Sequence, residues 1–142
     1  HLCNVVQIFE NDFDKIKASY DVIDEADVAR LKLRSNCAFN WINKYAPDAM
    51  KFTVQSEVKA KLEENQKKAI QDIVSYLEKT DELDEKMLFE EFYNISKGNG
   101  MEPKEFFKVC YNVLIDKDRG PKLAPFVVTL GKVRVLELFR KV

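Results

Sequence analysis

The longest regular pattern in the sequence is DEADVARLKLRSNCAFNWINKY, residues 24–45. Its apolar residues recur at helical spacing along the whole stretch. The pattern ends at Ala46-Pro47, because the residue before a proline is pushed out of the helical region. The stretch therefore predicts one helix of roughly 20 residues, and it favours an all-α fold for the sequence around it.

Weaker patterns lie on both sides of this segment. Before it, apolar residues at helical spacing predict two short helices, over about residues 2–9 and 13–20. After it the helical period is lost, and Lys51–Gln55 alternates polar with apolar residues as an extended segment does. We expect a helical subdomain over residues 1–50, an extended linker over 51–56, and a C-terminal helical region over 57–142.

The C-terminal region begins with two amphipathic patterns. The first predicts a long helix from about Val58 to Leu77. The second follows Asp84, which is a suitable N-cap residue, and ends at Gly98 or Gly100. The apolar stripe of this second helix is formed by Leu88, Phe89, Phe92 and Ile95.

Three more helices complete the prediction. Pro103 suits the first position of one of them. A short helix then starts at Pro121 or near Ala124, and Gly131 separates it from the last. The fold class that we predict is an all-α bundle of seven or eight short helices in two small subdomains.

The composition excludes several classes of protein. The 142 residues carry 23 Lys plus Arg against 24 Asp plus Glu, so the chain is not basic throughout. The only histidine is His1, so zinc sites and histidine-based catalysis have almost no material, and we predict no catalytic or metal-ligating residues. No apolar run approaches the ~18 residues of a membrane span. Three well-separated cysteines fit a reducing compartment.

The charge is unevenly distributed along the chain. Residues 117–142 contain seven bases and two acids, which gives this tail a charge of +5 and leaves −6 for the remaining 116 residues. This asymmetry favours an anionic partner at the C-terminal end. A basic last helix is also ordinary helix chemistry, because cations complement the helix dipole there.

The segment 24–45 has a second face opposite its apolar one. That face gathers cations around the only tryptophan: Arg30, Arg34, Cys37, Trp41 and Lys44. Aromatic rings stack on unpaired bases and cations contact the phosphate backbone, so the face suits a nucleic acid. The alternative is that Trp41 packs against a neighbouring helix or another domain, with the arginines paired to carboxylates.

A second cationic feature is the turn Lys117-Asp118-Arg119-Gly120-Pro121-Lys122. It presents three cations directly before a predicted helix, where backbone N–H groups carry partial positive charge. A phosphate or a base edge fits this chemistry, and a solvated turn is the alternative.

Two sets of motifs resemble a known family. The first set is GNGMEPKEFF (98–107), KDRGPKLAPF (117–126) and LGKVRVL (130–136), and it is similar to the C-terminus of class I lysyl-tRNA synthetases. The second is NWINKYAPD (40–48) followed by KF (51–52), which resembles another segment of that family. Lys122 stands where the family commonly has Arg, and Val133 replaces a frequent acidic residue. Glutamyl-tRNA synthetases share a similar C-terminal pattern.

The resemblance implies a fold and a function. The fold would be an α-helix cage that receives the anticodon of a lysine tRNA in the cytoplasm, with neither DNA nor a membrane as partner. Lysylation with ATP and Mg would belong to a separate catalytic domain, because the two adenylate-handling signatures of that domain do not occur in this chain. The chain, which begins at His1 without an initiator Met, would be a non-catalytic fragment.

The candidate tRNA-binding residues come from both cationic features and the end of the chain. Phe126 has a core position as its alternative role, and Arg134 that of a surface charge on a helix. A helical protein-interaction module, or the equivalent domain of a glutamyl-type enzyme, is the alternative function. The candidates are Arg30, Arg34, Trp41, Lys44, Lys117, Arg119, Lys122, Phe126, Lys132 and Arg134.

Overall fold

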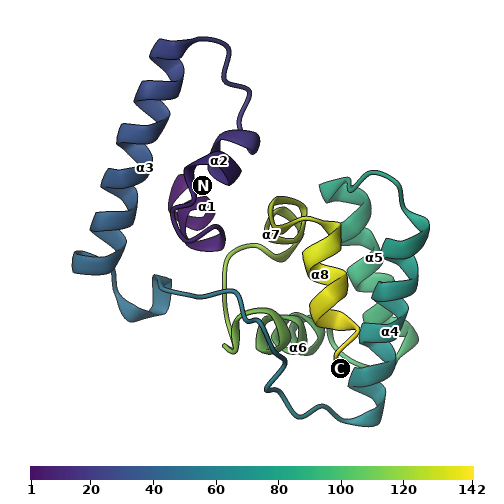
Figure 1. Ribbon diagram of the computed structural model, residues 1–142. Helices are drawn as coiled ribbons and strands as arrows, with labels where there is room; N and C mark the ends of the chain where they lie inside the picture. The colour runs from purple at the N-terminus through teal and green to yellow at the C-terminus, as the bar shows by residue number, and fades with distance from the viewer. The chain divides into compact units, whose positions relative to one another are not determined.

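The computed structural model describes residues 1–142, with eight α-helices, one short 3-10 helix and no strand (Figure 1). The prediction of an all-α chain with seven or eight helices is confirmed. The chain divides into two compact units, His1–Val54 and Gln55–Val142. None of the helices combines the length and the apolar character that crossing a membrane requires.

The first unit is built on α3 (Glu25–Tyr45), against which α1 (Leu2–Ile8) and α2 (Phe13–Ala18) pack. Asp24 caps α3, because its carboxylate accepts a hydrogen bond from the Asp27 N–H at 2.8 Å. The helix ends before Pro47, as the sequence predicts. The buried core of this unit consists of Val5, Val6, Ile16, Ile42 and Ala46.

Gln7 ties the segment after α3 to α1. Its side chain is 8% exposed, and its Nε2 donates to the Met50 carbonyl at 3.1 Å. Its Oε1 accepts from the Phe52 N–H at 2.9 Å. The 3-10 helix η1 (Asp48–Met50) lies in this segment. Because a buried amide needs partners, these bonds hold residues 50–52 in the first unit.

The second unit contains α4 (Glu64–Lys79), α5 (Glu85–Gly98), α6 (Pro103–Ile115), α7 (Leu123–Leu130) and α8 (Lys132–Phe139). Contacts join α5 to α4, α6 and α7, and α8 to the same three helices. The five helices thus enclose one core, drawn in teal to yellow in Figure 1. Its largest fully buried side chains are Phe92, Phe106, Ile70, Ile73, Leu77, Leu88, Leu114 and Leu138.

The prediction of a helix beginning near Val58 was wrong, because α4 begins at Glu64. The helix starts at a capping box, in which the Glu63 N–H donates to the Gln66 Oε1 at 3.0 Å. The chain before it is extended and is bonded to α6 through Gln55, whose N–H donates to the Leu114 carbonyl at 2.8 Å. The spacing of Val58 suits a helix, but this cap and this tertiary bond decide the boundary.

The other starts agree more closely with the sequence. Asp84 caps α5 by accepting from the Met87 N–H at 2.9 Å, and Pro103 is the first residue of α6. The next helix, α7, begins at Leu123, between the two predicted starts. Pro125 therefore lies in the first turn, where a helix needs no backbone donor.

Candidate nucleic-acid interface

The face of α3 that carries its cations and Trp41 is exposed in the first unit, and we call it the outer face of α3. Trp41 is 41% exposed, and the core of this unit takes Ile42 from the opposite face. Arg30 lies 3.3 Å from Asp27 in an exposed ion pair, whereas Arg34 has no acidic partner. Exposed ion pairs are weak, so this face keeps most of its positive charge. Its cations and its tryptophan are Arg30, Arg34, Lys44 and Trp41.

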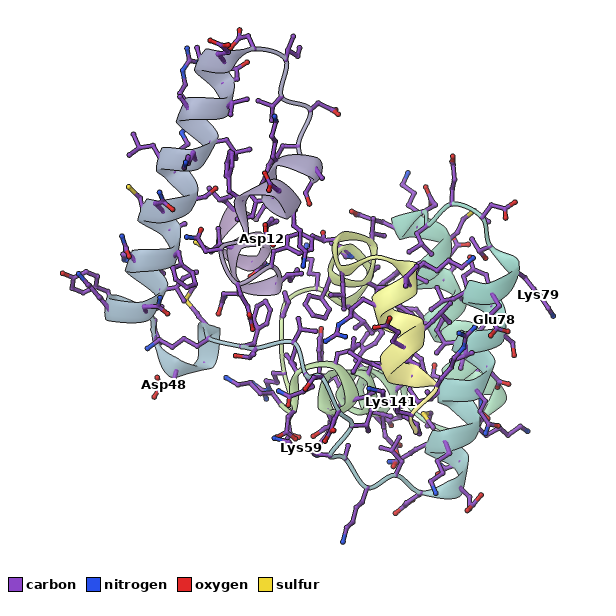
Figure 2. All side chains as sticks on the ribbon, viewed as in Figure 1. Asp12, Asp48, Lys59, Glu78, Lys79 and Lys141 are labelled. Atoms are coloured by element: carbon purple, nitrogen blue, oxygen red, sulfur yellow. The ribbon has the colours of Figure 1, made fainter.

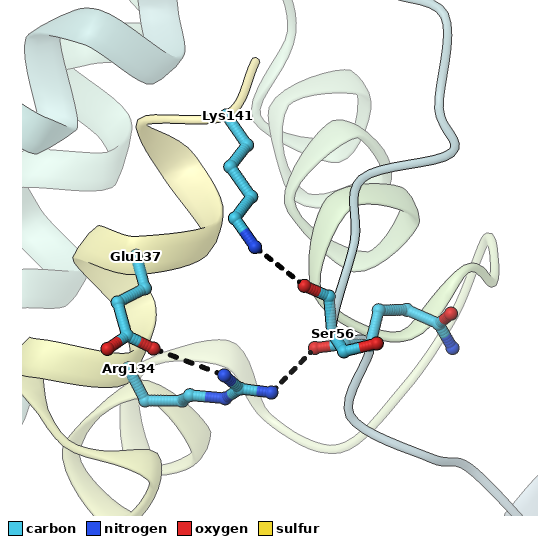
Figure 3. A network of polar contacts seen from close by, with 5 residues as sticks. Ser56, Arg134, Glu137 and Lys141 are labelled. Carbon is cyan, nitrogen blue, oxygen red and sulfur yellow. Dashed lines mark hydrogen bonds and ion pairs between the residues drawn. The ribbon is translucent and has the colours of Figure 1, made fainter.

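The basic tail behaves differently, because much of its charge is bound within the second unit. The Lys132 Nζ donates to the Thr80 carbonyl at 2.7 Å. The Arg134 guanidinium donates to the Gln55 carbonyl and to the Glu137 carboxylate, both at 3.1 Å (Figure 3). Both candidates from this part of the chain therefore hold the fold together in this structure.

The last two cations of the chain also bind their own unit. Arg140 pairs with Glu78 of α4 at 2.6 Å. The Lys141 Nζ donates to the Ser56 carbonyl at 2.8 Å, and Figure 2 shows Lys141 and Glu78 among the side chains of this unit. Four of the seven tail cations thus fasten α8 and the end of the chain to α4 and to the segment that precedes it.

The turn between α6 and α7 holds the remaining three tail cations. Asp116 ends α6 in the left-handed region, with φ of 54°. Asp118 is drawn toward α6, because the Asn112 Nδ2 donates to its carboxylate at 3.2 Å and the Lys108 Nζ lies 3.9 Å away. This carboxylate forms its ion pair with Lys108 and not with Arg119 or Lys122.

Arg119 and Lys122 are the exposed cations of this turn, and neither has an acidic partner. Lys117 is half-buried. Phe126, three residues into α7, is 2% exposed and belongs to the core, so its ring offers no face to a base in this structure. The turn thus presents two exposed cations, whereas Phe126 is part of the core.

Tyr111 of α6 fixes the position of the turn. Its hydroxyl donates to the Pro121 carbonyl at 2.6 Å. Gly120 passes so close to α6 that a Cβ there would lie 2.8 Å from Ile115 and 3.0 Å from Tyr111. Burial raises the pKa of the Tyr111 hydroxyl, with a further contribution from Cys110, so this donor keeps its proton.

A pocket of about 540 Å³ lies beside this turn, between α5, α6 and the start of α7. Its walls include three aromatic rings, those of Phe89, Phe107 and Tyr111. The sequence places Phe89 in the apolar stripe of α5, but the structure leaves it 47% exposed. Leu88, the residue before it, is buried, whereas Tyr93, four residues after it, is 36% exposed. Residues four apart share a helix face, so the spacing of Phe89 and Tyr93 was the signal that the sequence offered for an outer aromatic face of α5.

A family model for the anticodon binding domain matches residues 34–142. The match starts within α3 and includes the whole second unit. The chain belongs to this family. The exposed turn, the aromatic pocket and most of the outer face of α3 therefore all lie within the part that matches the anticodon binding domain.

Several curated proteins are similar to this chain. Lysine–tRNA ligase of Borreliella burgdorferi is 42% identical over 134 residues, which cover 92% of the chain and 26% of that protein. Lysine–tRNA ligase of Treponema pallidum is 36% identical over 95% of the chain and 26% of its own length. That of Thermococcus kodakarensis is 34% identical over 83% and 23%. The chain spans about a quarter of the length of these relatives.

Proposed function

We propose that this chain is the anticodon-recognition part of a lysine–tRNA ligase and that it holds a lysine tRNA in place for lysylation. The family match to the anticodon binding domain is the observation that supports this proposal most strongly. The similar proteins are named lysine–tRNA ligases, which favours lysine over glutamate as the cognate amino acid. ATP with Mg would serve a catalytic domain elsewhere in a longer cytoplasmic protein, and this chain would contribute recognition alone.

Each unit contributes one contact surface to the proposal. Anticodon bases are unpaired, so their receptor needs aromatic faces, and cations for the phosphates. In the second unit, Arg119 and Lys122 supply free cations beside an aromatic pocket. In the first unit, Arg34, Trp41 and Lys44 supply the same two kinds of group on α3. Lys132 and Arg134 are bound internally and act in the proposal only as supports of the fold.

The proposal is tested by measuring the affinity of the chain for a lysine-tRNA anticodon stem-loop at several salt concentrations. The logarithm of the affinity falls linearly with the logarithm of the salt concentration. Each lost phosphate contact makes this slope shallower by about 0.7 to 0.9. We expect such a loss for Arg119→Gln and again for Lys122→Gln. The control is Lys68→Gln, which removes an exposed cation of α4 away from the turn and should leave the slope unchanged.

Specificity needs a second comparison in the same assay. A glutamate-tRNA stem-loop and an unrelated stem-loop should both bind more weakly than the lysine one. Equal affinity for all three would remove the claim of lysine specificity. Stronger binding of the glutamate loop would favour the glutamyl-type alternative.

One observation favours a different function for the first unit. Leu33 and Tyr45 on α3 are 65% and 74% exposed, and large exposed apolar side chains often mark a protein contact. This reading assigns the face of α3 to a protein partner. It predicts that Trp41→Leu leaves RNA affinity unchanged, whereas the RNA reading predicts a loss of at least about fivefold, the effect of one stacked base.

A further inference from the structure

The pocket beside α7 has walls that are held in place before any ligand arrives. Phe89 and Phe107 lie 6.4 Å apart in a stacked arrangement with an angle of 29° between their planes. Behind them, Phe107 meets the buried rings of Phe92 at 6.1 Å and Phe106 at 6.3 Å. Aromatic pairs at these separations stabilise one another, so the exposed rings rest on a fixed aromatic base.

The opposite side of the pocket is equally constrained. Leu123, Ala124 and Pro125 form it, at the start of α7. The bond from the Tyr111 hydroxyl to the Pro121 carbonyl fixes the chain just before this helix, with Gly120 allowing the close approach.

The lining of the pocket also includes charged residues. These are Lys86, Lys122 and one acid, Glu85, and Arg119 lies three residues before Lys122 in the same turn. An apolar aromatic cavity with cations in its lining matches a ligand that joins a flat ring to an anion. An aromatic side chain of a peptide has the ring without the anion. A nucleotide has both, since its base stacks on aromatic faces and its phosphate meets cations.

We propose that the pocket lined by Phe89, Phe107 and Tyr111 receives one unstacked base of the tRNA anticodon loop, with the adjoining phosphate on Lys122. This assignment rests on the proposed function. Its volume of about 540 Å³ falls within the range of pockets that bind small molecules, about 300 to 1,000 Å³. Tyr111 acts here as a positioning residue, because its hydroxyl is committed to Pro121.

The test pairs a change in the RNA with a change in the protein. Lysine-tRNA anticodon stem-loops, each with one loop base removed to leave an abasic site, are titrated against the chain and its Phe89→Leu variant. Base–aromatic stacking predicts that the wild-type chain loses about 5- to 150-fold in affinity when the base that enters the pocket is removed. Removing the same base should cost the Phe89→Leu variant much less affinity. The base and the ring form one contact, so the losses from removing each of them do not add.

Two control variants separate the pocket from its surroundings. Met87→Ala truncates an exposed apolar side chain of the same helix outside the pocket, and it should keep the full response to every abasic site. Lys122→Gln should weaken the binding of all the stem-loops to a similar extent and make the salt dependence of the affinity shallower. The loop position at which removal of the base costs most affinity should stay the same. Far-UV circular dichroism of each variant verifies that the helices are retained.

The outcomes distinguish this inference from the proposed function. A response at one loop position that shrinks in Phe89→Leu supports the base pocket. Tight binding of the stem-loop with additive losses at every position would overturn the pocket and leave anticodon binding intact. Failure of the wild-type chain to bind the lysine stem-loop at low salt would overturn the proposed function and, with it, the pocket's assignment.

Discussion

Gly120 is the residue on which the position of the turn before α7 depends most directly. The space where its Cβ would lie is already occupied by the buried side chain of Ile115 and by the ring of Tyr111. No positive φ requires a glycine here, so the constraint is one of close approach. Any larger residue has to move the turn, and the cations that it presents, away from α6.

We therefore expect Gly120→Ala to destabilise the chain by about 1 to 3 kcal/mol, the usual cost of overpacking. Urea unfolding measures this as a lower midpoint with an unchanged slope. The matched control is Gly98→Ala in the last turn of α5, where nothing lies within 4 Å of the added Cβ. This control should be neutral or stabilising by about 1 kcal/mol, because alanine favours a helix over glycine. Equal effects of the two changes would contradict the close approach.

Cys110 links the core to the pH dependence of stability. Burial raises the pKa of its thiol far above the ordinary value. Below about pH 8.5 the thiol is protonated in both the folded and the unfolded chain, so its full contribution to the free energy of unfolding is present. Above that pH the unfolded chain loses this proton and the folded chain keeps it, so stability falls as pH rises.

The expected fall approaches about 1.4 kcal/mol per pH unit for this one group between about pH 8.5 and 10. Urea unfolding at a series of pH values measures it, and Cys110→Ala should flatten the curve. The exposed Cys37 supplies the control, Cys37→Ala, which should leave the slope as it is. A curve that keeps its slope in Cys110→Ala would show that another group is responsible.

Among single residues, the sequence located the cations of the tail but did not distinguish those that stay exposed from those that bind within the fold. Arg119 and Lys122 are free at the surface, and their role in RNA binding stays a prediction. Lys132 and Arg134 donate to carbonyls 52 and 79 residues away in the chain. No local pattern reveals such distant acceptors. The pocket was missed for the same reason, because its rings come from two helices, α5 and α6, that only the tertiary fold brings together.

At the scale of elements, capping residues are the clearest signals in the sequence of where a helix begins. The stretch 24–45 has its capping acid, its apolar face and its terminating proline in sequence, so its bounds followed directly. The beginning of α4 did not, because apolar spacing continues upstream of the capping box at Glu63. Local chemistry specified the existence of the helices, and tertiary bonds of the segment after Val54 decided where α4 could begin.

Capping predicts separate losses in the two units. Asp24→Ala removes the acceptor for the Asp27 N–H in α3, and Asp84→Ala removes the acceptor for the Met87 N–H in α5. Each change should cost about 1 kcal/mol. Only Asp24→Ala should lower the midpoint followed by Trp41 fluorescence, since Trp41 lies in the first unit. Asp24→Asn and Asp84→Asn, which retain a capping oxygen, should recover most of the loss.

At the scale of the whole molecule, the two units differ in size and in the extent of their cores. The first spans residues 1–54 and buries a small cluster around Val5, Val6 and Ile16. The second spans residues 55–142 and encloses five helices. Smaller units bury a smaller fraction of their surface and are correspondingly less stable.

We expect the first unit to melt before the second. Trp41, the only tryptophan, reports on the first unit, whereas far-UV circular dichroism reports on the helices of both. On heating, the fluorescence midpoint should therefore lie below the main circular dichroism transition. Coincident midpoints would indicate that the two units unfold as one cooperative system.

The bond from Lys141 to Ser56 brings the start and the end of the second unit side by side. A domain whose termini meet can be cut from one position in a polypeptide and inserted at another with little strain. It also tolerates circular permutation, in which a short linker joins the old termini and new ones are opened at an exposed loop such as the one between α4 and α5. The two carbonyls that Arg134 and Lys141 hold at residues 55 and 56 thus make this unit a transplantable module.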